Sequence, residues 1–201
     1  MRSDTAYAPV WQADDADLQT VLDVLTEAFM SDPLVRWLFP KAGERGLLQR
    51  HFYRPLLTRP AAEAYLTGRR EGASVWLTLA PGQAPHEEPP GTTGRGSLWG
   101  ESGARLLTLG RALAERHPNG QPHLYLPCMG VIGGRRGAGL GSAMLRHRLA
   151  RADADGLPAY LEASSSRGRA LYLRHGFEDR GEPVHVADGL LLWPMWREPR
   201  P

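Results

Sequence analysis

Apolar residues recur at helical spacing near the start of the chain. They predict a helix that begins after Asp14 or Asp15, either of which can act as the N-cap, and continues to about Met30. The positions that share one face of this helix are Leu18, Val21, Leu22, Leu25 and Phe29.

Alternation of apolar and polar residues, with Pro and Gly as boundaries, predicts the other elements of the first half. A hairpin is expected from two strand-like runs joined by Gly68 to Gly72. The elements, in chain order, are a strand at 7–12, a short helix from Pro33 capped by Asp32, a helix at 44–59 interrupted by Pro55, strands at 62–67 and 73–79, and a helix at 98–116. The Pro- and Gly-rich stretch 80–97 is long for a loop, and we expect either a flexible loop beside the acceptor site or a tolerated insertion.

The second half predicts a β–α–β unit followed by further alternation. A strand at 123–132, interrupted by Pro127, leads through a glycine-rich turn into a helix from about Gly139. The elements that follow are a strand at 158–163, a helix at 167–175, and strands at 177–180 and 189–196.

Composition limits the class of protein. The 201 residues, 42% hydrophobic and 23% charged, suit one domain over residues 1–201. The N-terminus lacks an apolar signal core, and no apolar run is long enough to span a bilayer, so we expect a cytoplasmic protein without a membrane partner. A net charge of +2 implies no nucleic-acid partner. The single cysteine, Cys128, excludes a disulfide framework and favours a core role.

The turn from Arg135 to Ser142 is the strongest candidate ligand site. Its glycines allow close approach of the backbone, and the first amides of the following helix lack helical partners. Such a helix N-terminus binds phosphate or pyrophosphate. A ligand-free turn that packs the helix on the strand remains the alternative.

Three phosphate-binding patterns compete for this turn. A P-loop starting at Gly134 fails, because Leu140-Gly141 stands where Lys and Ser or Thr are required. A dinucleotide fingerprint from Gly137 is weak but open, with Glu162 near the expected acidic position. The pattern Arg/Gln-x-x-Gly-x-Gly/Ala is matched without a gap by Arg136, Gly139 and Gly141.

The chain resembles the GNAT superfamily of N-acetyltransferases, most closely the branch of puromycin N-acetyltransferase. The segments that carry the resemblance are HLYLPCMGVIGGRRGAGLGSAML, GLPAYLEASSS and ALYLRHGF, with EAFMSDPLVRWLFP near the N-terminus. The resemblance implies an α/β (α+β) GNAT fold. That fold is a mixed, mostly antiparallel sheet of about six to seven strands with helices on both faces and splayed fourth and fifth strands, here 123–132 and 158–163.

The resemblance also implies acetyl-CoA as cosubstrate. Backbone groups of Met129 to Val131 would bind the pantetheine, and amides of Arg136 to Ser142 the pyrophosphate. The expected coenzyme-binding residues are Met129, Gly130, Val131, Arg136, Gly137, Ala138, Gly139, Leu140, Gly141, Ser142, Gly168 and Tyr172. This branch usually carries Pro-Arg-Asn after the fifth strand, whereas this chain has Ser166-Arg167-Gly168, so Ser165 or Ser166 would have to replace the asparagine.

Acetyl transfer to an amine needs proton removal from the nitrogen and, for the leaving thiolate, a proton donor. Tyr172 is the expected acid and Glu162 the expected base. The alternatives are a tyrosine that packs its helix on the sheet and a carboxylate that pairs with arginine. Asp32 and Glu101 are weaker candidates for the base, and a water chain could replace it. The histidines show no metal-ligand spacing, so we expect no metal.

The acceptor is expected to be a small-molecule primary amine, an antibiotic or metabolite, attacked directly in a ternary complex. An apolar pocket for it could use Phe29, Trp37, Phe39, Tyr53, Trp99 and Trp193. The alternatives are acetylation of protein N-termini or lysines, a non-catalytic acyl-CoA sensor, and a nucleotide-binding regulatory module. The protein would be a monomer or homodimer.

Overall fold

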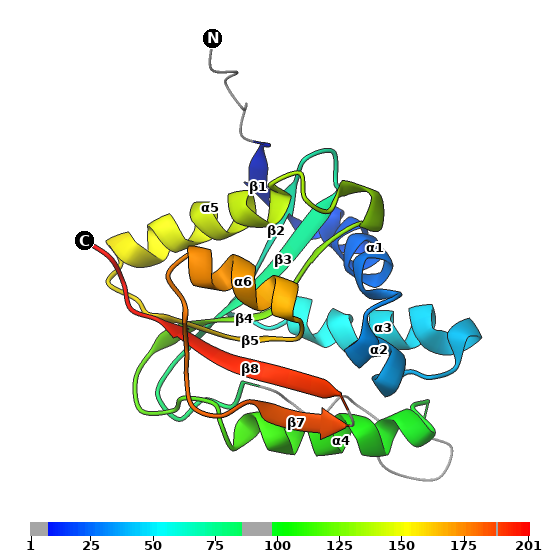
Figure 1. Ribbon diagram of the computed structural model, residues 1–201. Coiled ribbons are helices and arrows are strands. Elements are labelled where there is room, and N and C mark those ends of the chain that lie inside the picture. The colour runs from blue at the N-terminus through cyan, green and yellow to red at the C-terminus, as the bar shows by residue number, and fades with distance from the viewer. Residues whose placement is uncertain (1–7, 86–97, 188) are drawn as a thin grey trace.

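The computed structural model describes residues 8–85, 98–187 and 189–201 (Figure 1). Most of the expected loop at 80–97, and part of the expected first strand, lie outside these residues. The helices are α1 (Leu18–Phe29), α2 (Pro33–Leu38), α3 (Ala42–Leu57), α4 (Glu101–Ala114), α5 (Leu140–Ala154) and α6 (Ser166–Arg174). The strands are β1 (Val10–Gln12), β2 (Ala62–Thr67), β3 (Gly72–Leu79), β4 (His123–Val131), β5 (Ala159–Ala163), β6 (Glu178–Asp179), β7 (Val184–Ala187) and β8 (Leu190–Arg197).

Two aspartates begin the first helices as the sequence predicts. Asp14 accepts hydrogen bonds from the amides of Ala16 and Asp17 and starts the 3-10 turn that leads into α1. Asp32 accepts from the amides of Leu34 and Val35 at the start of α2. In both cases a side-chain oxygen satisfies donors that the helix itself cannot.

Two expectations about the elements were wrong. Pro55 does not interrupt α3, because it lies in the last turn and removes one hydrogen bond close to the end of the helix. The sheet has eight strands among the described residues rather than six to seven. The strand missed was β7, which is only four residues long and pairs with β8 alone.

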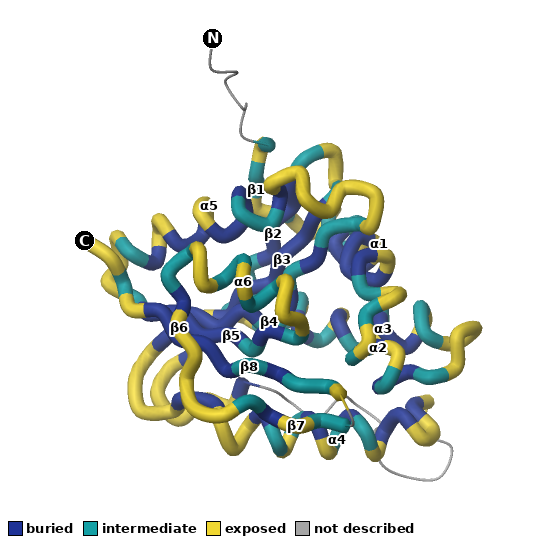
Figure 2. The backbone as a smooth tube through the Cα atoms, viewed as in Figure 1, coloured by how far each residue is buried: buried dark blue, intermediate teal, exposed yellow. Residues whose placement is uncertain are grey.

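The strands form a mixed, mostly antiparallel sheet in the order β1-β2-β3-β4-β5-β8-β6, with β7 beside β8. Among the strands of the described residues, β4 and β5 are the one pair that runs parallel. Helix α5 packs against β2 and β4 on one face of the sheet, and α1 and α3 pack against the other face. Figure 2 shows the central strands as the most deeply buried part of the chain. This is the expected GNAT fold.

An irregularity in β4 changes which face its side chains reach. Val75 of β3 pairs with Cys128 and Leu77 pairs with Tyr125, so Leu126 and Pro127 together oppose the single residue Trp76. The extra residue inverts the alternation. Leu126 therefore packs in the core under α5, whereas Cys128 packs in the core under α1.

The end of β8 is held to α5 by a buried ion pair. Arg197 donates to both carboxylate oxygens of Asp153, at 2.6 and 2.7 Å, and to the carbonyl of His175 at 3.0 Å. Only 4% of the Arg197 side chain is exposed. The Arg197 guanidinium holds the pKa of Asp153 below its ordinary value. The pair thereby connects α5, β8 and the residue after α6.

Asp153→Asn should lower the free energy of unfolding by about 2–3 kcal/mol at pH 7, because it leaves a buried guanidinium without its counter-ion. This loss of stability is smaller than that expected for a fully buried ion pair, because 22% of the Asp153 side chain is exposed. Since the pKa of Asp153 is lowered on folding, the wild-type advantage should be complete above about pH 4 and disappear on further acidification. Urea unfolding measures both effects. Asp155→Asn, which removes an exposed 4.0 Å pair with Arg151, is the matched control and should leave stability unchanged.

Candidate active site

A cavity of about 710 Å³ lies where β4 and β5 separate. The two strands pair only at Leu124–Ala159, Tyr125–Tyr160 and Leu126–Leu161, although β4 continues to Val131. Pro127 has no N–H to donate, and the irregularity in the pairing of β4 with β3 at this position bends β4 locally. The resulting gap has the size of a small-molecule or cofactor site.

The glycine turn forms one end of the cavity. Gly137 and Gly139 have φ of +93° and +81°, values that side chains other than glycine rarely adopt. Gly139 directly precedes α5, so the first amides of that helix point into the turn. Arg136 connects the turn to α1, because its guanidinium donates to the carbonyl of Ala28 at 2.6 Å.

The structure gathers nearly all of the residues expected to bind coenzyme around this one cavity. Those that line it are Met129, Gly130, Val131, Arg136, Gly137, Gly139, Leu140, Gly141, Ser142, Gly168 and Tyr172. Ala138 is the exception. It is not part of the lining, and its amide donates to the carbonyl of Arg135 at 3.3 Å. Their roles toward coenzyme remain predictions.

Tyr172 lies on α6 at the cavity wall, with its ring against Phe177 at a centroid distance of 5.9 Å. Burial raises the pKa of its phenol, and the nearby Cys128 adds to the increase. The hydroxyl therefore stays protonated at neutral pH, as a proton donor must.

Glu162 lies on β5 and also lines the cavity. Its side chain is only 6% exposed. The phenol of Tyr125 donates to its Oε2 at 3.0 Å, and Nδ1 of His117 lies 4.0 Å from its Oε1. Among the described residues, the polar side chains closest to the Glu162 carboxylate thus include those of Tyr125 and His117, which argues against the alternative that Glu162 forms an arginine ion pair.

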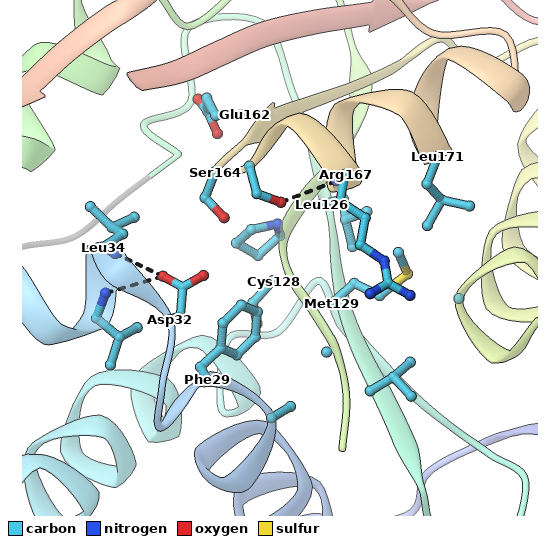
Figure 3. A pocket seen from close by; sticks show the side chains of 18 of the residues that line it. Phe29, Asp32, Leu34, Leu126, Cys128, Met129, Glu162, Ser164, Arg167 and Leu171 are labelled. Carbon is cyan, nitrogen blue, oxygen red and sulfur yellow. Dashed lines mark hydrogen bonds between the residues drawn. The ribbon is translucent and has the colours of Figure 1, made fainter. Parts of the chain in front are cut away.

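Asp32 is a second carboxylate at the cavity. Figure 3 shows Asp32, Glu162 and Ser164 on one side of β4, and Arg167, Met129 and Leu171 on the other. Burial raises the pKa of Asp32, and the amides of Val35 and Leu34 oppose that increase. Glu101, the other candidate for the base, lines a separate cleft of about 380 Å³.

Charge is therefore divided between the two ends of the cavity. The glycine turn contributes Arg135 and Arg136 to the lining, and α6 contributes Arg167 and Arg174. Arg135 pairs with Glu71, and the charge of Arg136 also acts on Asp32 and lowers its pKa against the larger effect of burial. The other end carries Asp32 and Glu162 among apolar side chains. Cationic side chains and helix amides attract an anionic ligand, and the carboxylates attract a cationic one.

Three of the six aromatic residues expected around the acceptor line the cavity, namely Phe29, Phe39 and Tyr53. Trp99 instead stacks on Phe39 in the core. The guanidinium of Arg105 lies over the ring of Trp37, and Trp193 packs against the core cluster under α5. The remaining apolar lining at this end was not anticipated and comes from Leu34, Val35, Leu38, Phe52, Leu109, Leu113 and Leu192. Leu109 and Leu113 lie in the helix expected at 98–116, but only the packing shows that they face a cavity.

Local contacts explain why glycine stands at position 168, where the puromycin N-acetyltransferase branch usually carries asparagine. Ser165 caps α6, and its hydroxyl accepts from the amide of Gly168 at 3.1 Å. A Cβ at position 168 would lie 3.1 Å from that hydroxyl and 3.6 Å from the ring of Tyr172. Ser164 and Ser165 line the cavity, whereas Ser166 does not.

Two other expectations concern chemistry at Cys128 and metals. Cys128 belongs to the core, and burial raises its pKa to about 12, which does not suit a thiolate nucleophile. In the described ranges, no three His, Cys, Asp or Glu side chains are placed to hold a metal ion together. No helix in the described part of the chain has the length and hydrophobicity needed to span a bilayer.

The model of the Acetyltransferase (GNAT) family matches residues 83–177, which contain β4, the glycine turn, α5, β5 and α6. The fold is the GNAT fold, and the matched segment, just under half of the chain, is similar to this family. The puromycin N-acetyltransferase branch remains a prediction.

Solved structures agree with the GNAT assignment. One from Corynebacterium glutamicum, described as "histone acetyltransferase HPA2 and related acetyltransferase", is 28% identical with a TM-score of 0.70, covering 97% of this chain and 98% of that chain. Arylalkylamine N-acetyltransferase 2 from Aedes aegypti is 14% identical with a TM-score of 0.72, covering 96% and 99%. The ribosomal-protein-S18-alanine N-acetyltransferase from Escherichia coli is 12% identical with a TM-score of 0.54, covering 96% and 95%. The last two show similarity of fold alone.

Gly139→Asp should weaken acetyl-CoA binding by about 100-fold or more. An aspartate here would occupy the helix amides with its own carboxylate and repel a diphosphate. Aspartate tolerates positive φ better than most residues, so the fold should survive. Titration calorimetry with acetyl-CoA measures the affinity.

Gly181→Asp is the matched control, because Gly181 also has a positive φ, of +73°, and open space around it, but lies outside the cavity lining. It introduces the same charge and similar backbone strain and should leave binding intact. Equal affinity in both variants would show that this turn does not bind the diphosphate.

Proposed function

We propose that this protein is an acetyl-CoA-dependent N-acetyltransferase whose acceptor is a primary amine on an apolar small molecule. The observation that carries the proposal is the division of one cavity into a basic, glycine-lined end and an apolar, acidic end. The first suits an anionic cosubstrate and the second a cationic, hydrophobic acceptor. Direct attack in a ternary complex follows, because both ends open into the same space.

The residues present fit acetyl-CoA, which supplies the acetyl thioester. The amides at the start of α5, opened by Gly137 and Gly139, would hold the pyrophosphate, with Arg167 across the turn. The edge of β4 beyond Leu126 is not paired with β5, so its backbone is available to the pantetheine amides. Gly141, where a Cβ would lie 3.2 Å from Leu171, keeps α5 close to α6 at this point.

Glu162 and Tyr172 would perform the proton transfers. Glu162 accepts a proton from the ammonium group, directly or through water, and so releases the lone pair that attacks the thioester carbonyl. Tyr172, whose pKa is raised by burial, donates to the sulfur as the C–S bond breaks and regains a proton from the nitrogen that has formed the new bond. Each role is typically worth 100-fold or more in rate.

The lining of the acidic end supports an apolar amine. Phe29, Phe39, Phe52 and several leucines line the same cavity as Asp32 and Glu162. Arg136, which donates to the carbonyl of Ala28, is a lining cation whose charge acts on Asp32. A cationic amine on an aromatic or aliphatic body satisfies both the apolar and the acidic part of this lining. Some proteins of this fold are named arylalkylamine N-acetyltransferases, which is consistent with such an acceptor.

The function is tested in two steps. Acetyl-CoA should raise the melting temperature, and a thiol-release screen should then find turnover with arylalkylamines and hydrophobic alkylamines rather than with acidic amines. Tyr172→Phe should lower kcat about 100-fold with little change in the Kd of acetyl-CoA, because it removes the proton donor but keeps the ring.

Tyr65→Phe is the matched control, since Tyr65 is a buried tyrosine whose phenol donates to Glu63 and which does not line the cavity. Stabilisation by acetyl-CoA without turnover on any amine would favour the non-catalytic sensor. Turnover only with peptides would favour a protein acetyltransferase. Preference for NAD or ATP over acetyl-CoA would favour a nucleotide-binding module.

Asp32→Asn should raise KM for the amine about 10-fold and leave the Kd of acetyl-CoA unchanged. The change removes a charge that faces the acceptor, while the asparagine oxygen can still cap α2. Steady-state kinetics with a cationic amine measure the effect. Asp14→Asn alters a helix-capping aspartate far from the cavity and should change neither constant. An unchanged KM in Asp32→Asn would exclude Asp32 from acceptor binding.

A further inference from the structure

A buried pair of histidines, His117 and His123, lies behind Glu162 and outside the cavity lining. His117 follows α4 and His123 begins β4, and their Nε2 atoms are 2.9 Å apart. The His117 ring is enclosed by Tyr125 and Tyr160, at centroid distances of 4.9 and 4.8 Å. The His117 side chain is only 2% exposed. None of these contacts is needed to form the cavity.

Hydrogen bonding determines the position of the proton on each histidine. Nδ1 of His123 lies 3.0 Å from the carbonyl oxygen of Gln121, which can only accept, so Nδ1 carries the hydrogen. Burial lowers the pKa of His123, so the ring is neutral and its Nε2 is bare. His117 must therefore donate from its own Nε2 to His123.

This arrangement leaves Nδ1 of a neutral His117 as an acceptor, and it faces another acceptor. Oε1 of Glu162 lies 4.0 Å away. Among the described residues neither atom has a hydrogen-bond partner. Two buried acceptors face to face are unfavourable, but one added proton satisfies both atoms. A small rotation of the carboxylate, or one bridging water, closes the gap.

We propose that His117 is a positioning residue that takes the proton of the acceptor amine from Glu162 and so restores its carboxylate. This inference rests on the proposed function. The first ammonium proton passes to Glu162 and then to Nδ1 of His117, which becomes an imidazolium while Nε2 keeps its hydrogen bond to His123. The second proton leaves the nitrogen after the C–N bond has formed and ends on the departing thiolate. One proton is finally released to solvent.

The surrounding charges suit a transient imidazolium. Glu162 faces His117 from β5 and stabilises its positive charge, and His123 faces it as a neutral acceptor. Tyr125 and Tyr160 stay protonated, because burial raises the pKa of both phenols and Glu162 raises it further. Arg116 and Arg180 are the nearby cations. Arg116 donates to the carbonyl of Glu182, and Arg180 lies over the ring of Trp196.

The test is the pH dependence of His117→Gln. Glutamine can still donate to His123 but cannot carry a proton. At pH 7 kcat/KM for the amine should fall about 10-fold or more, with the Kd of acetyl-CoA unchanged. The deficit should shrink toward pH 9, because the fraction of amine that arrives without its extra proton rises about 100-fold over that range.

His185→Gln, which changes an exposed histidine on β7, is the control and should behave as wild type at every pH. A deficit in His117→Gln that is the same at pH 7 and pH 9 would indicate a purely structural role and overturn the proposal. So would full activity at pH 7.

A second measurement needs neither the variant nor turnover. Long-range ¹H–¹⁵N spectra of wild-type protein labelled at histidine nitrogens should show the hydrogen of His123 on Nδ1 and that of neutral His117 on Nε2. A neutral His117 with its hydrogen on Nδ1 would remove the acceptor that faces Glu162 and overturn the proposal. Because the spectra report the proton arrangement directly, this result stands even if no amine in the screen is acetylated.

Discussion

The separation of β4 from β5 is the constraint on which the rest of the site depends. The strands share only three paired positions, and Pro127 cannot continue the hydrogen-bonded ladder. The irregularity at Leu126 and Pro127 also inverts the side-chain alternation of β4, which sends Cys128 into one core and Met129 toward the other. A single local break therefore opens a cavity, frees one edge of backbone, and still allows both faces of the sheet to be packed by helices.

The two ends of this cavity obtain their chemistry from different parts of the chain. The basic end comes from two segments, because the turn before α5 supplies amides with Arg135 and Arg136, and α6 adds Arg167 and Arg174. The acidic end is assembled from distant segments, with Asp32 before α2, Glu162 on β5 and apolar side chains from α1 to β8. Burial raises the pKa of Tyr172 and so keeps its phenol protonated. The carboxylate of Glu162 is also buried, and it accepts a hydrogen bond from Tyr125.

Local patterns were the reliable part of the sequence reading. Helical spacing and the caps at Asp14 and Asp32 located α1 and α2, and the glycines at 137 and 139 stand where the backbone has positive φ. Features that depend on few residues or on distant partners were missed. β7 is too short to show alternation, and Pro55 is tolerated because it lies in the last turn of α3. Trp37, Trp99 and Trp193 look equivalent to Phe29 in sequence, yet they pack elsewhere.

By itself the sequence determined the order of the elements except β7, the glycine-rich turn before α5, and the residue types available for acid and base chemistry. These depend on neighbours within one or two turns of chain, whose spacing is visible in the sequence. Only the tertiary structure decided that the basic and acidic ends share one cavity, and that His117 and His123 stand in line behind Glu162. The contacts of His117 reach residues 6 and 45 positions away, and Asp32 and Glu162, which line one cavity, are 130 positions apart. Their geometry comes from tertiary packing rather than from any local pattern.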